Sequence, residues 1–240
     1  MLKCADFTLE LTSMRAKFFV LGLLTLIGLL MQGCGGSVTS QGISRVRALN
    51  LLDSPASIDV VSDGTLVALG LGTGNLSGYS QVQSGFVPFN ARPDGSTNTI
   101  ASFDLTASNN VNYTVVAYKN SSNQPAMSAT IDDYTAPDAG LYKVRIIHLD
   151  RLVGNVDLYV TQPDADLADE TPVVTNVPFE FATGYYQFTA GSSLEFRITN
   201  AGTKTVIGQA LTLNPNAGVF RSIAIYDNSG VQTKLISDNG

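Results

Sequence analysis

Hydrophobic and polar positions alternate in short runs along most of this 240-residue chain. From residue 43 onward, apolar residues recur with a period of two or form brief β-branched blocks, and no window shows a long 3.6-residue period. Turn-forming residues separate these runs. The pattern predicts about seven strands per hundred residues, which is the density of a β-sandwich. The clearest runs are 86–89, 99–105, 113–118, 194–199, 206–213 and 222–226.

Self-comparison divides the region into two copies. Residues 45–61 align without a gap with residues 143–159, at an offset of 98. Further on, 113–120 recurs as 220–228, with an offset that has grown to 106–108, so the second copy carries extra residues. The polar stretch 161–172 is the place where a longer loop is expected. The matched pairs include Arg47 and Arg145, Asn50 and His148, Asp59 and Asp157, and Tyr79 and Tyr185.

These observations predict an all-β protein with two tandem immunoglobulin-like or transthyretin-like β-sandwich domains. We expect the first repeat to span 43–135 and the second to span 138–240. A short turn-rich linker near residues 133–140 joins them. Residues 34–42 are rich in Gly, Ser and Gln and predict a flexible tether before the first repeat.

The amino-terminal segment predicts export. Arg15 and Lys17 precede an uncharged apolar run at 18–31, which is too short for a membrane span but fits the core of a signal peptide. We therefore expect residues 1–33 to be a signal peptide. Asp6 and Glu10 are unusual so early in a signal, which leaves a start at Met14 open.

Residues 31–34, Met-Gln-Gly-Cys, resemble a bacterial lipobox. The resemblance implies lipidation of Cys34, cleavage before it, and anchoring in the bacterial cell envelope through the lipid. Gly35 is not the aspartate that retains lipoproteins in the inner membrane of enteric bacteria, so we expect the protein in the outer membrane. Whether it faces the periplasm or the outside of the cell is left open. The alternative is an ordinary secretory signal that leaves Cys34 as a free thiol.

Charge narrows the set of partners. The chain has a formal charge of −6, and removing residues 1–33 takes away three basic and two acidic residues, which leaves −7. An acidic body argues against nucleic acid as a partner, because phosphates require basic patches. It also argues against electrostatic docking on anionic lipid. Cys34 is the one cysteine left after cleavage, so no internal disulfide is expected.

Both copies open with a basic-Val-Arg strand, followed by a turn and an apolar-Asp-apolar strand. In these features, residues 43–240 resemble the bacterial domain-of-unknown-function family 4397. The first copy has Asn50 where the family pattern has histidine, and the second has His148 but Arg151-Leu152 in place of Ser-Pro. The resemblance implies a β-sandwich domain of exported proteins, often in tandem. It brings no activity.

Few residues suggest chemistry. His148 is the chain's single histidine, and its strand position, on one face with Val144 and Ile146, favours a packed, hydrogen-bonded side chain. Asp59 and Asp157 occupy equivalent places, and we expect each to accept backbone N–H bonds from a neighbouring loop. There is no G-x-S-x-G motif. We predict no catalytic residue.

Neither a metal site nor a cofactor site is predicted. The acidic stretch 163–170 could gather around Ca²⁺, but it lacks the EF-hand pattern, and a solvated loop is the preferred interpretation. The glycine-rich stretch 70–78 lacks the third glycine of a dinucleotide-binding loop, so we interpret it as a loop between strands. One histidine cannot supply a zinc site.

Aromatic residues offer one candidate surface. Tyr185 and Tyr186, with Phe179 and Phe181, could form a patch for a carbohydrate or a protein ligand, although core positions are the commoner place for aromatics. Three hypotheses result. The first is a non-enzymatic, lipid-anchored binding or adhesive module; the second is a structural or assembly component of the envelope. The third is a hydrolase of unfamiliar design built around His148 or the acidic loop.

Overall fold

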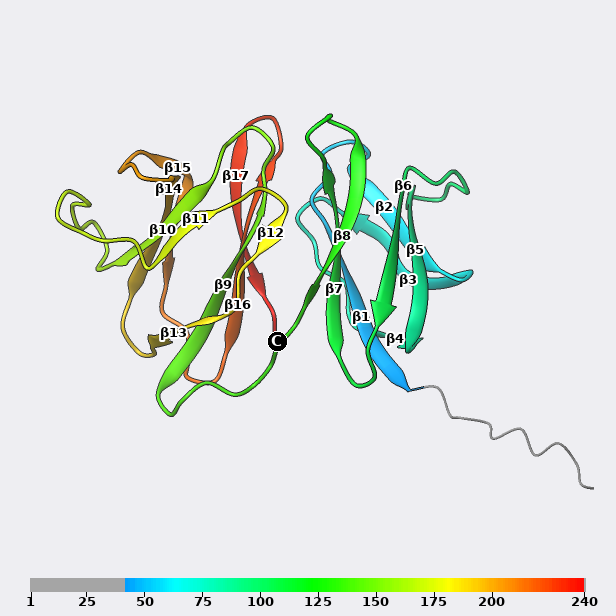
Figure 1. Cartoon of the computed structure of the whole chain (residues 1–240), viewed down its shortest axis with the longest axis horizontal. Helices are drawn as coiled ribbons and strands as arrows, with labels where there is room; N and C mark the ends of the chain where they lie inside the picture. The colour runs from blue at the N-terminus through cyan, green and yellow to red at the C-terminus, as the bar shows by residue number, and fades with distance from the viewer. Residues whose placement is uncertain (1–41, 240) are drawn as a thin grey trace, which may run out of the picture. The chain divides into compact units, whose positions relative to one another are not determined.

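The computed structural model describes residues 42–239. The predicted signal peptide, the lipidation at Cys34 and the tether up to residue 41 lie outside the described residues. Within residues 42–239 the chain is all β, with 17 strands in four sheets and no helix, which confirms the predicted fold class (Figure 1). This part of the chain therefore has no helix that could span a membrane.

Two four-stranded sheets are built wholly from the first half of the described chain. Their strand orders are β4-β1-β7-β8 and β3-β2-β5-β6. The strands are β1 (Ile43–Asn50), β2 (Ser57–Ser62), β3 (Thr65–Gly72), β4 (Ser80–Gln83), β5 (Gly85–Pro93), β6 (Ala101–Ala107), β7 (Asn112–Lys119) and β8 (Pro125–Ile131).

The other two sheets come wholly from the second half. Their orders are β12-β9-β16-β17, with β13 also paired to β9, and β11-β10-β14-β15. All six apolar runs predicted from the sequence overlap a strand of one half or the other. The strands are β9 (Leu141–Leu149), β10 (Val156–Thr161), β11 (Val174–Val177), β12 (Phe181–Ala182), β13 (Tyr186–Thr189), β14 (Leu194–Asn200), β15 (Val206–Leu213), β16 (Phe220–Asp227) and β17 (Val231–Ser237).

The two halves repeat the same strand pairing. β1 runs parallel to β7 with Arg47 opposite Thr114, and β9 runs parallel to β16 with Arg145 opposite Ser222. Arg47 and Arg145 are 98 residues apart, and Thr114 and Ser222 are 108 apart, which are offsets found by self-comparison. Equivalent positions of the two copies therefore have equivalent places in the sheets.

Each half has its own apolar core, and a third cluster is shared by both. On β1, Val46 and Ala48 belong to the core of the first half, whereas Leu49 lies in the shared cluster. Both faces of β1, β7, β9 and β16 are therefore covered, which explains their near-continuous apolar runs. The buried members of the shared cluster are Leu49, Leu51, Val116, Tyr118, Ile147, Leu149, Ala224, Tyr226 and Ile236.

Residues 132–140 join the halves without forming a strand. Residues 41–240 form one compact unit, since contacts across the shared cluster tie the halves together. Division into separate domains at 43–135 and 138–240 stays a prediction.

The shared cluster leads us to expect that both halves unfold together. Ile147 is 3% exposed and lies in this cluster. Ile147→Ala should destabilise the whole chain by about 2–5 kcal/mol through lost burial and a residual cavity. Calorimetry should show one transition in both proteins, shifted to lower temperature in the variant. Two resolved transitions, of which the substitution shifts one, would contradict this coupling.

Candidate functional site

Two buried arginines, one from each half, form reciprocal ion pairs. Nη2 of Arg47 donates to Asp238 at 2.8 Å, and Nη2 of Arg145 donates to Asp132 at 2.5 Å. Asp132 directly follows β8, and Asp238 directly follows β17. Each arginine thus reaches the carboxylate of the other half. Such reciprocity means that an approximate two-fold axis relates the halves.

Hydroxyl groups complete the two pairs. Nε of Arg47 donates to Thr114 at 2.8 Å, and Nε of Arg145 donates to Ser222 at 2.7 Å. Each hydroxyl then donates to the carboxylate of its own half, both at 2.7 Å. The hydrogen bonds satisfy the buried charges that ion pairing alone would leave short of partners.

Tyrosines cover both guanidinium groups. The Arg47 Cζ lies 4.9 Å from the ring centre of Tyr79, and the Arg145 Cζ lies 4.7 Å from that of Tyr185. Tyr79 donates to Asp132 at 2.5 Å, and Tyr185 donates to Asp238 at 3.1 Å. Burial raises the pKa of both phenols, so they stay protonated donors.

Sequence analysis matched Arg47 with Arg145 but did not predict their burial. Burial by itself lowers the pKa of Arg47, but the electrostatic interactions with its neighbours, Asp132 first and Asp238 among the others, together outweigh burial and raise that pKa. The signal available was an arginine repeated at one position inside an otherwise apolar strand. The four charges are paired with each other, so this network is structural and not a reactive centre.

His148 is fully buried at the end of β9, as the sequence predicted. Its Nδ1 accepts the backbone N–H of Asp150 at 3.4 Å, so Nε2 carries the proton and donates to the Gly154 carbonyl at 2.9 Å. In the first half, Asn50 makes the same pair of bonds. It accepts the N–H two residues on at 2.9 Å and donates to the Leu71 carbonyl at 2.8 Å. Both side chains hold a chain reversal after the strand.

Asp59 and Asp157 each accept one backbone N–H bond from a neighbouring loop, as predicted, and a second one from an adjacent strand. Asp59 binds the amides of Gly70 and Gly95 at 2.8 and 3.1 Å. Asp157 binds two amides in the same way, at 2.7 and 2.8 Å, from Asn176 and Gly202. All four donors have positive φ, a conformation in which glycine and asparagine are the favoured residues. The repeated aspartates therefore fix loop geometry.

The acidic stretch 163–170 and the glycine-rich stretch 70–78 show no ligand geometry. Within residues 42–239, no three His, Cys, Asp or Glu side chains converge as a metal site would require. Residues 70–72 belong to β3, so the loop expected over 70–78 begins at residue 73, and an isolated bridge at Leu76 interrupts it.

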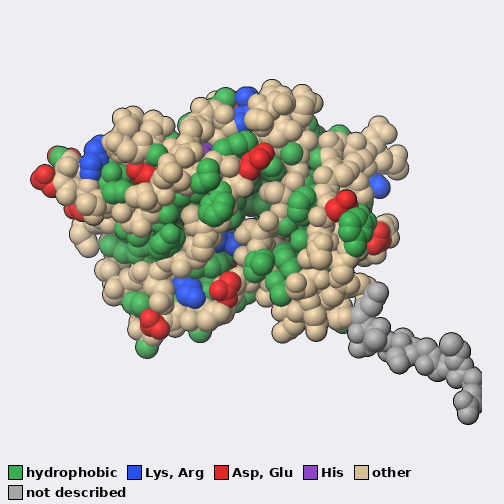
Figure 2. Space-filling view, in the orientation of Figure 1, with side chains coloured by type: hydrophobic (Ala, Val, Ile, Leu, Met, Phe, Trp, Pro, Cys, Tyr) green, Lys and Arg blue, Asp and Glu red, His purple; other side chains and the backbone are tan. Residues whose placement is uncertain are grey.

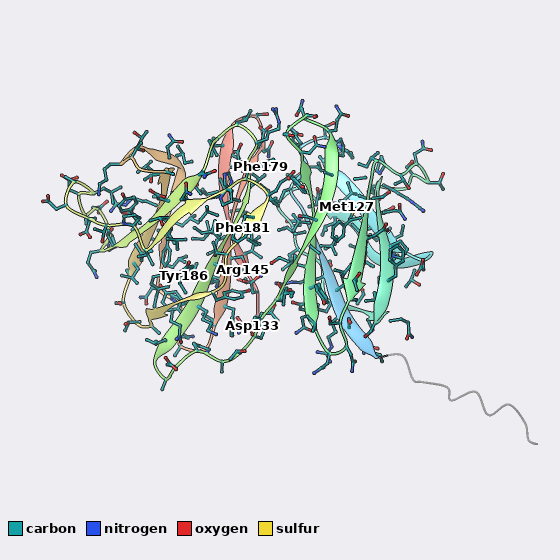
Figure 3. The ribbon with its side chains drawn as sticks, viewed as in Figure 1. Met127, Asp133, Arg145, Phe179, Phe181 and Tyr186 are labelled. Carbon is teal, nitrogen blue, oxygen red and sulfur yellow. The ribbon has the colours of Figure 1, made fainter. Side chains whose placement is uncertain are left out.

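A groove of about 500 Å³ lies on the seam between β8 and β12. Phe181 and Ile131 line it and are strongly exposed, at 51% and 57%. Figure 2 shows apolar side chains gathered at the surface over β12. Phe181, Arg145 and Asp133, labelled in Figure 3, are among its lining residues. The full lining is Ala129, Thr130, Ile131, Asp133 and Arg145 with residues 180–185.

The equivalent seam on the other side of the two-fold axis carries different side chains. There Lys234 of β17 lies against Gly74, where an added Cβ would be 3.6 Å from the lysine Cε. Strand pairing makes Ser128 of β8 the residue equivalent to Lys234, because Ser128 lies opposite Val116 and Lys234 lies opposite Ala224. A short side chain on β8 therefore stands at the position that a long side chain occupies on β17.

The predicted aromatic patch is divided by the fold. Phe179 packs on the shared cluster beside Tyr118, and Tyr185 lies beneath Arg145. Phe181 and Tyr186 are exposed, at 51% and 36%. Only part of the patch is therefore available to a ligand, and its members that line the groove are the exposed Phe181 and the half-buried Tyr185.

The fold and these sites define a class of protein, namely an all-β protein in which two similar sheet pairs are joined by a buried, reciprocal ion-pair network. Within that class, residues 44–159 match the model of the family described as "Domain of unknown function (DUF4397)". The match runs from β1 into β10, so it covers the first half and the first strands of the second.

Solved structures give distant similarities. One is a carbohydrate-binding module of family CBM26 from Eubacterium rectale Amy13K in complex with maltoheptaose, at 11% identity and a TM-score of 0.28, covering 82% of this chain and 98% of that one. Another is described as alpha-glucan binding by a streptococcal virulence factor, at 10% identity and a TM-score of 0.27, covering 80% and 97%. A comparison with curated proteins finds no match.

Burial of neutral His148 predicts a pH-dependent stability. Burial lowers the His148 pKa from its ordinary value of 6.5, so below that pH the unfolded chain binds the proton more readily than the folded chain. The contribution of neutral His148 to the free energy of unfolding is complete above about pH 6.5. It is lost as pH falls toward the lowered folded-state pKa. His148→Asn, the residue of the first half, should remove this dependence.

The check is urea unfolding of both proteins from pH 8 to pH 5. As the pH falls through this range, the unfolding free energy of the unaltered protein should fall relative to that of His148→Asn. Asp150, whose pKa burial raises, also titrates but is present in both proteins, so the comparison isolates the histidine. Parallel curves would contradict the assignment of a neutral, buried imidazole.

Proposed function

We propose that the chain is a non-enzymatic binding module of the bacterial envelope, anchored by lipid on Cys34, that binds a neutral carbohydrate. The observation that carries the proposal is the open groove on the β8–β12 seam. It combines an exposed aromatic ring with carboxylates and hydroxyls. The ring is complementary to the apolar face of a sugar, and the polar groups are complementary to its hydroxyls. The apolar C–H face of a pyranose stacks on an aromatic ring, whose face carries negative charge density.

Charge in the groove favours a neutral ligand over an acidic one. Glu180 and Asp133 are exposed carboxylates that can accept hydrogen bonds from sugar hydroxyls. The single cation of the lining, Arg145, already donates to Asp132, Ser222 and the β8 backbone. Its positive charge is therefore committed, and an anionic glycan would meet carboxylates without a compensating cation.

Two features support binding rather than catalysis. The hydrolase hypothesis predicted a concave pocket with converging polar side chains around His148 or the acidic loop, whereas His148 is buried with both ring nitrogens in hydrogen bonds. The aspartates repeated in both halves, Asp59 and Asp157, are engaged by backbone amides. The repeated polar residues thus serve the fold. The exposed Phe181 of the groove, in contrast, has Asn75 at its equivalent position in the first half.

Anchoring rests on the lipobox-like residues 31–34. Each buried methylene of an acyl chain contributes about 0.8 kcal/mol, and a single chain holds a protein only marginally. The several chains of a mature lipoprotein would hold the body durably. The acidic body adds no electrostatic attraction to anionic lipid, so the lipid must supply the attachment.

The groove proposal predicts that Phe181→Ala weakens glycan binding. Loss of the stacking ring should reduce affinity for a neutral oligosaccharide at least about tenfold, which corresponds to roughly 1.4 kcal/mol. Phe86→Ala is the matched control, because Phe86 is 70% exposed and lies outside the groove. The measurement is binding of residues 42–240 and both variants to an array of neutral and acidic oligosaccharides, followed by titration calorimetry. Binding that Phe181→Ala leaves unchanged, or binding to acidic glycans alone, would contradict the proposal.

The anchoring proposal predicts that Cys34→Ala releases the protein from membranes. The measurement is fractionation of cells that produce either protein, together with protease treatment of intact cells. The unaltered protein should sediment with membranes and the variant should be soluble. Cleavage on intact cells would place the groove outside, whereas protection until the outer membrane is opened would place it in the periplasm and favour an assembly role. A variant that stays membrane-bound would overturn lipid anchoring.

A further inference from the structure

A second charged cluster spans the two halves at the opposite end of the shared apolar cluster from the arginine network. Lys119 Nζ lies 2.6 Å from Asp53 and 3.5 Å from Asp227, and Arg151 lies 3.1 Å from Asp227. The charges alternate in sign along the row Asp53, Lys119, Asp227, Arg151. The side chains are 5–22% exposed, so solvent screens them less than it would a surface pair.

Each residue of this row in the first half has its equivalent in the row in the second half, and the two equivalent residues carry opposite charges. The offset of 108 that relates β7 to β16 makes Lys119 the counterpart of Asp227. The offset of 98 that relates the segments following β1 and β9 makes Asp53 the counterpart of Arg151. The contact across the halves, Lys119 to Asp227, therefore joins two equivalent residues near the two-fold axis.

The arginine network has the opposite property, because its equivalent positions carry the same residue types. A pairing of two first halves, or of two second halves, would reproduce those ion pairs. The row would not be reproduced. Two first halves would set Lys119 against a second Lys119, and two second halves would set Asp227 against a second Asp227. Like charges at close range oppose association.

We propose that the row Asp53, Lys119, Asp227, Arg151 makes the first half select the second half as its partner and reject another first half. The apolar cluster and the arginine network supply the attraction and the alignment, and the row supplies the repulsive element that specificity requires. A chain with two self-complementary faces could otherwise join further chains into an open string. Charge reversal at this row favours closure of each chain on itself.

The test exchanges the charges of one half at a time in the full chain. Asp53→Arg with Lys119→Asp keeps an ion pair within the first half but sets a carboxylate at position 119 against Asp227. Arg151→Asp with Asp227→Lys does the converse and sets two ammonium groups together. All four substitutions combined restore the alternating row in reverse. Net charge is the same in every variant.

Each half exchange should lower the melting temperature by at least roughly 2–4 °C, the shift expected for a modest destabilisation of a chain of this size. The fourfold variant should recover most of that loss. The loss should also shrink in high salt, because screening weakens like-charge repulsion. A matched control is Arg45→Asp with Asp104→Arg, which makes the same kinds of substitution at exposed positions and should leave the melting temperature unchanged. The proposal would be overturned if the half exchanges had the same melting temperature as the unaltered protein. It would also be overturned if the fourfold variant were no more stable than either half exchange.

Discussion

The two buried arginine–aspartate pairs are the interaction on which the arrangement of the halves depends. The shared apolar cluster contributes most of the attraction, but apolar burial has no direction and would tolerate sliding of one sheet over the other. A buried charge tolerates no such sliding, since losing one partner costs about 3–5 kcal/mol. Arg47 and Arg145 must both reach a carboxylate of the opposite half at once. One alignment of the sheets meets that demand.

The two-fold relation also shows which residues serve the fold and which do something else. Positions that keep their chemistry in both copies, such as the arginines and the loop-binding aspartates, have structural roles in each. Positions that differ mark local departures from symmetry. Ser128 of β8 differs from Lys234 of β17, and Lys119 differs from Asp227 at the axis. At positions of this kind, a duplicated structure can acquire a binding site in one copy that the other copy lacks.

Much of the fold and part of the site could be predicted from the sequence. Period-two runs and turn residues predicted the strands, and the repeated aspartates were correctly expected to bind loop amides, because a short carboxylate next to a turn has few other partners. Arg47 was harder to place, since an arginine in a strand ordinarily indicates a solvent-facing position. Its carboxylate partner comes from the far end of the chain, at Asp238, and no local pattern indicates that contact.

The aromatic patch is divided for a local reason. Phe179 and Phe181 are two residues apart, a spacing that puts side chains on one face of a regular strand. The intervening Glu180 has a φ of +62°, so the chain there is not a strand. The backbone turns between the two rings, which sends Phe179 onto the shared cluster and leaves Phe181 in the groove. Sequence spacing cannot reveal a single left-handed residue that is not glycine.

The groove inherits its rigidity from the arginine network. Nη1 of Arg145 donates to the Ile131 carbonyl at 2.7 Å and to Thr130 at 3.2 Å, so the guanidinium that joins the halves also holds the β8 wall. The other wall is held to β9 by the pairing of the two-residue strand β12 and by hydrogen bonds between Thr183 and Ile146. A ligand bound in the groove would therefore meet walls that hydrogen bonds already hold in place. A wall that is already ordered loses little conformational entropy on binding, and that favours recognition of a ligand through weak, shallow contacts.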